Sequence, residues 1–123
     1  MDYIVSAFSM LALDGIYLSS IGGTLFGKMV KNIQKEEMTI NLYGAIGCYI
    51  LLVLVLYKFI IMERKHPRDA FILGLCVYGV FDFTNIAIFK NYKWFPAIVD
   101  TLWGGILFYL VTFITYKIMS IRY

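Results

Sequence analysis

Four long apolar runs set the strongest limit on what this chain can fold into. They cover about residues 3–26, 39–62, 69–89 and 95–119. An α-helix rises about 1.5 Å per residue, so each run can cross a hydrocarbon core of about 30 Å. We therefore expect an all-α fold, an integral membrane four-helix bundle that forms one transmembrane domain over residues 1–123.

The composition supports this class. Hydrophobic residues make up 61% of the chain and the mean hydropathy is +0.77, whereas soluble domains are about 45–50% apolar. The first run does not resemble a signal peptide, because it lacks a basic start, is too long, and is interrupted by Asp14. Cys48 and Cys76 fall within the expected spans, where we interpret them as small apolar residues.

The charges outside the apolar interiors of the runs are mainly basic, since three of the eight acidic residues lie deep within the runs, whereas the eleven Lys and Arg residues lie in the loops or near the run ends. Basic loops beside a bilayer meet anionic lipid headgroups. Nucleic acid is not an expected partner, because the chain has no basic domain outside the membrane. Four crossings place both termini on one side, with six basic residues there against five on the other, which favours cytoplasmic termini only slightly.

The first run carries small residues at a spacing of four: Gly15, Ser19, Gly23 and Gly27. On one continuous helix these residues form a smooth ridge, and small side chains let helix backbones approach closely in lipid. We interpret the ridge as a helix-packing surface. Packing within one subunit and a contact between subunits of a homo-oligomer both remain open.

Three carboxylic acids lie inside the apolar runs, at Asp14, Asp82 and Asp100. Placing one such charge at the membrane centre costs roughly 3 kcal/mol on insertion scales, so these residues are expected to face a bundle interior or a water-filled cavity. No Lys or Arg occurs at a similar depth. We expect the three acids to form a descending series, with Asp100 in the first turn of its helix and Asp14 near mid-membrane.

Neighbouring polar and aromatic residues extend this candidate site. Helical spacing places Tyr78, Asp82, Asn85 and Phe89 on one face. Tyr17 is the expected local partner of Asp14, because it lies three residues further on. The residues predicted to bind an ion or ligand are Asp14, Asp82, Asn85, Asp100, Thr84, Tyr78 and Trp103.

Other kinds of site find little support in the sequence. His66 is the single histidine and lies in a basic loop, and there is no Cys/His cluster, so we expect no metal site. Phosphate-binding glycine loops and hydrolase motifs are absent. Each acid also has a structural alternative: Asp100 as an acid at a helix start, and Asp82 or Asp14 as hydrogen-bonded clamps between helices.

Three segments resemble a known family: Leu13-Asp-Gly-Ile-Tyr-Leu18, Tyr78-Gly-Val-Phe-Asp-Phe-Thr-Asn-Ile-Ala87 and Trp94-Phe-Pro-Ala-Ile-Val-Asp-Thr-Leu-Trp-Gly104. With the four-span layout, they resemble the "predicted membrane protein" family listed as domain of unknown function 2177. The resemblance covers nearly the whole chain and implies a membrane fold, with a site containing Asp14, Asp82 and Asp100. It implies no particular reaction.

Three functions are compatible with these features. The first is a small channel or transporter for a monovalent cation or a proton, which would use the intramembrane aspartates. The second is a membrane-embedded enzyme or binder that acts on a lipid or isoprenoid-like ligand. The third is a structural subunit whose polar groups only hold helices together. In every case the lipid bilayer is the surrounding partner.

Overall fold

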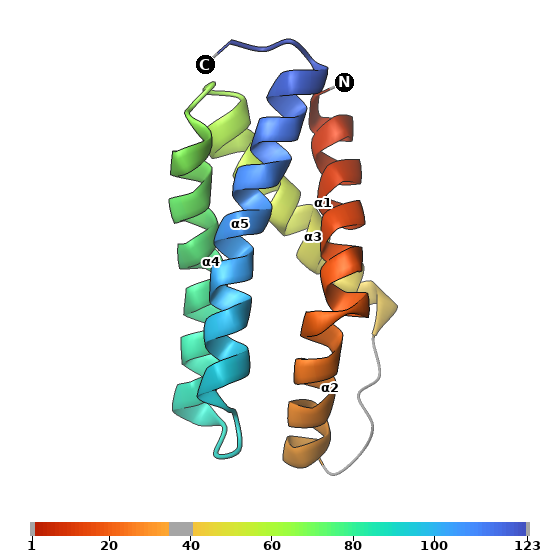
Figure 1. The fold of residues 1–123 in the computed structure, drawn as a ribbon, viewed down its shortest axis with the longest axis vertical. Helices are drawn as coiled ribbons and strands as arrows, with labels where there is room; N and C mark the ends of the chain where they lie inside the picture. Colours follow the sequence, from red (N-terminus) through yellow and green to blue (C-terminus); the bar gives the residue numbers. More distant parts are fainter. Residues whose placement is uncertain (1, 35–40, 123) are drawn as a thin grey trace.

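The structure is a computed structural model that describes residues 2–34 and 41–122. It is an all-α bundle, as expected (Figure 1). The helices in the described residues are α1 (Asp2–Ser19), α2 (Ile21–Gln34), α3 (Leu42–Leu56), the π-helical turn η1 (Tyr57–Ile61), α4 (Pro67–Ile88) and α5 (Trp94–Ile118). Three segments of these ranges, 42–61, 67–88 and 94–119, are long and apolar enough to span a membrane.

A break divides the first expected span, so that one helix over 3–26 is replaced by α1 and α2. The two helices are bent by 59° and together form a fourth candidate span. Sharp bends occur at Gly/Ser pairs, and here Ser19 and Ser20 stand at the break. Their hydroxyls donate to the Ile16 carbonyl at 3.2 and 2.7 Å, which satisfies a backbone acceptor where the helix is interrupted.

The break also divides the expected ridge of small residues. Gly15 and Ser19 lie exposed on α1, whereas Gly23 and Gly27 lie on α2. A Cβ added at Gly15 or Gly27 would meet nothing within 4 Å. A Cβ at Gly23 would overlap the carbonyl oxygen of Leu18. Close approach within the chain therefore accounts for Gly23 and not for Gly15 or Gly27.

The second span ends in a widened turn. In η1 the Met62 amide donates to the Tyr57 carbonyl at 2.8 Å, five residues back. The Tyr116 hydroxyl of α5 donates to the Lys65 carbonyl at 2.7 Å and so ties this end to the bundle. The expected start of the span at Thr39 lies outside the described residues.

Helices α4 and α5 form the tightest pair and run side by side in Figure 1. A Cβ at Gly74 would overlap the carbonyl oxygen of Gly104, and a Cβ at Gly104 would overlap the Tyr78 ring. Small residues therefore bring the two backbones into contact. The main apolar core beside this pair is fully buried and includes Met10, Leu56, Leu107, Phe108 and Val111.

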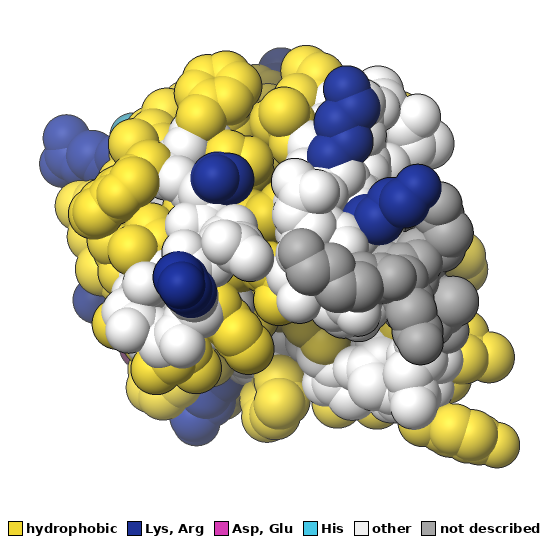
Figure 2. All heavy atoms as spheres, turned by 90° about the horizontal axis from the view of Figure 1, so that it is seen from below, with side chains coloured by type: hydrophobic (Ala, Val, Ile, Leu, Met, Phe, Trp, Pro, Cys, Tyr) yellow, Lys and Arg dark blue, Asp and Glu magenta, His cyan; other side chains and the backbone are white. Residues whose placement is uncertain are grey.

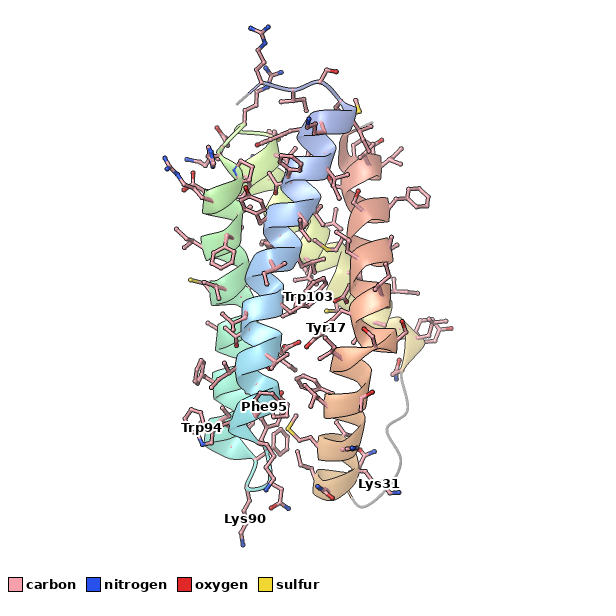
Figure 3. The ribbon with its side chains drawn as sticks, viewed as in Figure 1. Tyr17, Lys31, Lys90, Trp94, Phe95 and Trp103 are labelled. Atoms are coloured by element: carbon pink, nitrogen blue, oxygen red, sulfur yellow. The ribbon has the colours of Figure 1, made fainter. Side chains whose placement is uncertain are left out.

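The two ends of the bundle carry different elements. Both termini and the α3–α4 loop lie at one end (Figure 1). At that end His66 caps α4, with its ring nitrogen accepting from the Arg68 amide at 3.1 Å, and Pro67 and Asp69 occupy the first turn. The opposite end carries the α4–α5 loop and lysine side chains, among them Lys31 and Lys90 (Figures 2 and 3).

Candidate functional site

Asp82 is the most enclosed charged residue of the expected site. It lies on α4 with no exposed surface. Its Oδ1 accepts from the Tyr92 hydroxyl at 3.1 Å, and its Oδ2 accepts from the Thr101 hydroxyl at 3.1 Å. Both carboxyl oxygens are therefore held by neutral donors from the loop after α4 and from α5.

Asp100 faces Asp82 from the neighbouring helix. Asp82 lies six residues before the end of α4 and Asp100 six residues after the start of α5, so both are about 9 Å from the helix ends at the α4–α5 loop. Their carboxyl groups are within hydrogen-bonding reach of each other. A carboxylate only accepts, so a hydrogen bond between the two groups requires a proton on one of them.

The position of Asp100 corrects two expectations. It is almost two turns inside α5, which begins at Trp94 rather than near residue 96, so it is not an acid of the first turn. Tyr17 was expected to pair with Asp14, but its hydroxyl donates to Asp100 Oδ1 at 3.5 Å. The expected descending series therefore becomes a pair at one depth, Asp82 and Asp100, with Asp14 deeper.

Asp14 joins three helices near the middle of the bundle. The Trp103 indole nitrogen donates to its Oδ1 at 2.8 Å, and the Tyr49 hydroxyl of α3 donates to its Oδ2. The Tyr17 ring stacks on the Trp103 ring with a centroid distance of 4.8 Å, and both residues lie between the helices in Figure 3. This aromatic pair connects the surroundings of Asp14 to those of Asp100.

Asp14, Asp82 and Asp100 are connected in a row, called the acid chain below, and do not surround a common point. Within residues 2–34 and 41–122, no three His, Cys, Asp or Glu side chains are arranged to hold a metal ion. No Lys or Arg occurs between residues 69 and 89 or between 94 and 116. The donors to the three carboxyl groups are hydroxyl and indole groups. No basic side chain of α4 or α5 therefore neutralises the negative charge of the acids at this depth.

The other predicted site residues divide into two groups. Asn85 is half-buried and within hydrogen-bonding reach of Tyr92. Tyr78 is half-buried and packs edge-on against Phe108 at 6.3 Å between centroids. Thr84 is exposed on the outside of α4, away from the buried acids, so its expected part in binding stays a prediction.

Phe89 is also exposed, so the face expected to run from Tyr78 to Phe89 turns outward at its end. The cause is that α4 ends at Ile88 and the backbone of Phe89 is extended. Helical spacing therefore no longer sets the direction of that side chain.

Four donors were missed as parts of the site: Tyr17 as a partner of Asp100, and Tyr49, Tyr92 and Thr101. Only weak signals exist for them in the sequence. Tyr49 is a polar group in the middle of an apolar run, and Thr101 directly follows Asp100. Tyr92 had the signature of an interfacial anchor, which is the usual role of a tyrosine near the end of a span.

Tyr92 closes the site at the α4–α5 loop. It is buried beside Met29 and Ala97, and its ring meets the Phe26 ring edge-on at 6.2 Å. Burial raises the pKa of its hydroxyl, and the nearby Asp82 charge acts in the same direction. The hydroxyl therefore keeps its proton at neutral pH and remains a donor to Asp82.

An apolar layer separates the acid chain from the end that carries the termini. Met10, one helical turn before Asp14, has no exposed surface and packs in the main core with Leu56, Phe108 and Val111. The three acids thus reach from the α4–α5 loop to the middle of the bundle and end at this layer, where the buried polar groups that follow are the uncharged hydroxyls of Ser6, Thr112 and Thr115.

A family model described as a predicted membrane protein, domain of unknown function 2177, matches residues 1–117. Comparisons with curated proteins and with solved structures found no match. The match spans α1 to α5 and includes all three acids of the chain described above. The protein is therefore an integral membrane helical bundle that belongs to the predicted membrane protein family, domain of unknown function 2177.

Proposed function

We propose that this protein is a small transporter that binds and moves protons or a monovalent cation through its intramembrane aspartates. The observation that carries this proposal is the Asp82–Asp100 pair. Asp82 is fully buried, both of its oxygens accept from neutral hydroxyls, and its carboxyl group faces a second one. Ionisable residues at such depth commonly belong to ion or proton pathways.

The chemistry of the pair favours a small cationic species. Two adjacent carboxylates repel each other, and a proton or a bound cation between them removes that repulsion. Hydroxyl groups such as those of Tyr92 and Thr101 can rotate to accept as well as donate. They can therefore serve the pair in both its loaded and its empty state.

The apolar layer favours a gated transporter over an open pore. The acidic groups reach as far as Asp14, and the buried Met10 side chain begins the apolar layer one helical turn away. Movement of an ion across this layer requires the helices to rearrange. The break between α1 and α2 is one place where such a change could occur, because broken helices are common at transporter sites.

Ion flux into proteoliposomes tests the proposal. Wild-type protein should carry H⁺, Na⁺ or K⁺ down a gradient faster than protein-free liposomes do. Asp82→Asn retains the shape and removes the charge, so flux should fall to the protein-free level while the helical circular dichroism stays unchanged. Asp69→Asn is the matched control, because Asp69 is an exposed acid in the first turn of the same helix.

Wild-type liposomes that pass none of the three ions would contradict the proposal. Equal flux for wild type and Asp82→Asn would also contradict it, since the carboxyl pair would then have no part in transport. A fall in flux with Asp69→Asn as large as with Asp82→Asn would show a general loss of function, and the pair would lose its assigned role.

A second candidate function is the binding or conversion of a lipid or isoprenoid-like ligand. It is favoured by a groove of about 380 Å³ between the α1–α2 break and α5, lined mostly by apolar residues together with Tyr17, Ser20 and Trp103. A ligand tail could lie against Leu102 and Ile106 while its polar end reached the Tyr17–Asp100 bond. Retention of a non-phospholipid ligand in native mass spectrometry, lost in Leu102→Trp, would support this candidate.

A further inference from the structure

A second groove lies on the outer face of the bundle, between α1 and α3 and away from the acid pair. Its volume is about 650 Å³ and its lining is almost wholly apolar. Leu11 of α1 and Ile46, Ile50 and Leu54 of α3 form its walls. Ala7 and Ala45 also line it, and their short side chains leave room between the helices.

The dimensions of this groove fit a single lipid chain. On α3 and η1 its lining runs from Leu42 to Tyr57, and the rise between these two residues corresponds to about 22 Å. One leaflet makes up half of a hydrocarbon core of about 30 Å, so its acyl layer is shorter than the groove. The groove can therefore hold the full depth of one leaflet's acyl chain.

The end of the groove nearest the termini has the features of a headgroup level. Tyr3 and Tyr57 line it, with their rings edge-on at 6.1 Å between centroids. Tyrosine rings prefer the boundary between hydrocarbon and headgroups. Lys58 follows Tyr57, is exposed, and stands four residues after the groove-lining Leu54, on the same side of the helix.

The charge at this end favours an anionic headgroup. The sequence places six basic residues and three acidic ones at this end; the acids are Asp2, Glu63 and Asp69, and the basic residues are Lys58, Arg64, Lys65, Arg68, Lys117 and Arg122. Each such basic residue near a membrane surface contributes about 1 kcal/mol of attraction to anionic lipid.

We propose that the groove between α1 and α3 is a binding site for one acyl chain of an anionic phospholipid, whose headgroup lies at Tyr57 and Lys58.

The groove also lies beside one hydrogen bond of the acid chain. Tyr49 lines the groove, and its hydroxyl donates to Asp14. A lipid chain in the groove covers this hydrogen bond from outside and keeps it in an apolar setting.

Native mass spectrometry after extensive delipidation tests this site. Nanodiscs that contain equal amounts of phosphatidylglycerol and phosphatidylcholine supply the two probe lipids. Wild-type protein should retain one phosphatidylglycerol. Ala45→Phe fills the groove and should weaken retention by at least about tenfold. Ala87→Phe is the matched control, because Ala87 is exposed on α4, outside the groove. This variant should retain as much phosphatidylglycerol as wild type.

Two further results decide the details. Lys58→Gln should lower the preference for phosphatidylglycerol by about fivefold, as loss of one basic residue implies. Equal retention by wild type and Ala45→Phe, or equal retention of both lipids by wild type, would overturn the proposal. A wild-type dimer that Ala45→Phe converts to monomer would assign the groove to a second copy instead, and would also overturn it. None of these outcomes depends on ion flux.

Discussion

The indole nitrogen of Trp103 on α5 lies 2.8 Å from Oδ1 of Asp14 on α1, although the two residues are 89 positions apart in the chain. This bond joins the first and last helices of the bundle. The Trp103 ring also stacks on Tyr17, whose hydroxyl donates to Asp100, so Trp103 contacts Asp14 directly and is linked to Asp100 through Tyr17. The arrangement predicts that Trp103 stabilises the fold as well as the site.

Trp103→Phe should lower stability, because a phenyl ring keeps the stacking but donates nothing to Asp14. Loss of a hydrogen bond to a buried carboxyl group costs about 1–3 kcal/mol. Thermal unfolding in detergent measures the change. Trp94→Phe is the control, since Trp94 is 60% exposed and should tolerate the change. Equal melting temperatures for wild type and Trp103→Phe would show that this hydrogen bond contributes nothing.

Much of the helical layout could be predicted, because lipid leaves each spanning segment few ways to satisfy its backbone other than a helix. The runs that became α3 with η1, α4 and α5 were visible in hydropathy alone. The break after Ser19 was missed, although Ser19, Ser20, Gly22 and Gly23 stand at it. Small residues favour both close packing of helices and bending of a helix. Their spacing of four residues indicated only the packing.

The burial of the three acids inside the bundle could be predicted, because a carboxyl group in lipid has few acceptable surroundings. Their partners could not, because each donor comes from another helix or from a loop. Tyr49, Tyr92 and Thr101 reach Asp14 or Asp82 only once the bundle is assembled. Helical spacing relates residues on one helix, which explains why Tyr17 was assigned to Asp14 and not to Asp100.

Gly74→Ala should destabilise the bundle, since the added methyl group would overlap the Gly104 carbonyl oxygen and force α4 and α5 apart. Overpacking of this kind costs typically about 1–3 kcal/mol. Gly47→Ala is the control, because a Cβ there would meet nothing within 4 Å, and Ala is the better helix former. Thermal unfolding should place the Gly74 variant below wild type and the Gly47 variant at or above it. The reverse order would contradict the close contact of α4 and α5.

Thr112→Val should stabilise the protein. The Thr112 hydroxyl is fully buried, and within the part of the chain that the structure describes it has no hydrogen-bond partner. An unsatisfied buried polar group costs about 1–3 kcal/mol, and valine has nearly the same shape. Thr115→Val is the matched control, because it removes a hydrogen bond of 3.1 Å to the Ser6 hydroxyl and should lower the melting temperature. Destabilisation by Thr112→Val would show that this hydroxyl is satisfied.

Gly15→Leu and Gly23→Leu should separate assembly from folding along the divided row of small residues. Gly15 is exposed and a Cβ there meets nothing within 4 Å, so its leucine variant should fold as well as wild type. Gly23→Leu should unfold the protein, because its side chain would overlap the Leu18 carbonyl at the break. If the α1 face around Gly15 is a contact between subunits, Gly15→Leu should convert an oligomer to monomers, because small residues are needed for close approach in lipid.

Mass measurement in detergent and in nanodiscs reports the outcome of this pair of variants. A wild-type oligomer that Gly15→Leu leaves intact would reject the α1 face as the contact between subunits. A strictly monomeric wild type in both media would reject assembly altogether. Any ion path would then lie within one bundle, where the apolar layer around Met10 would have to open for an ion to cross.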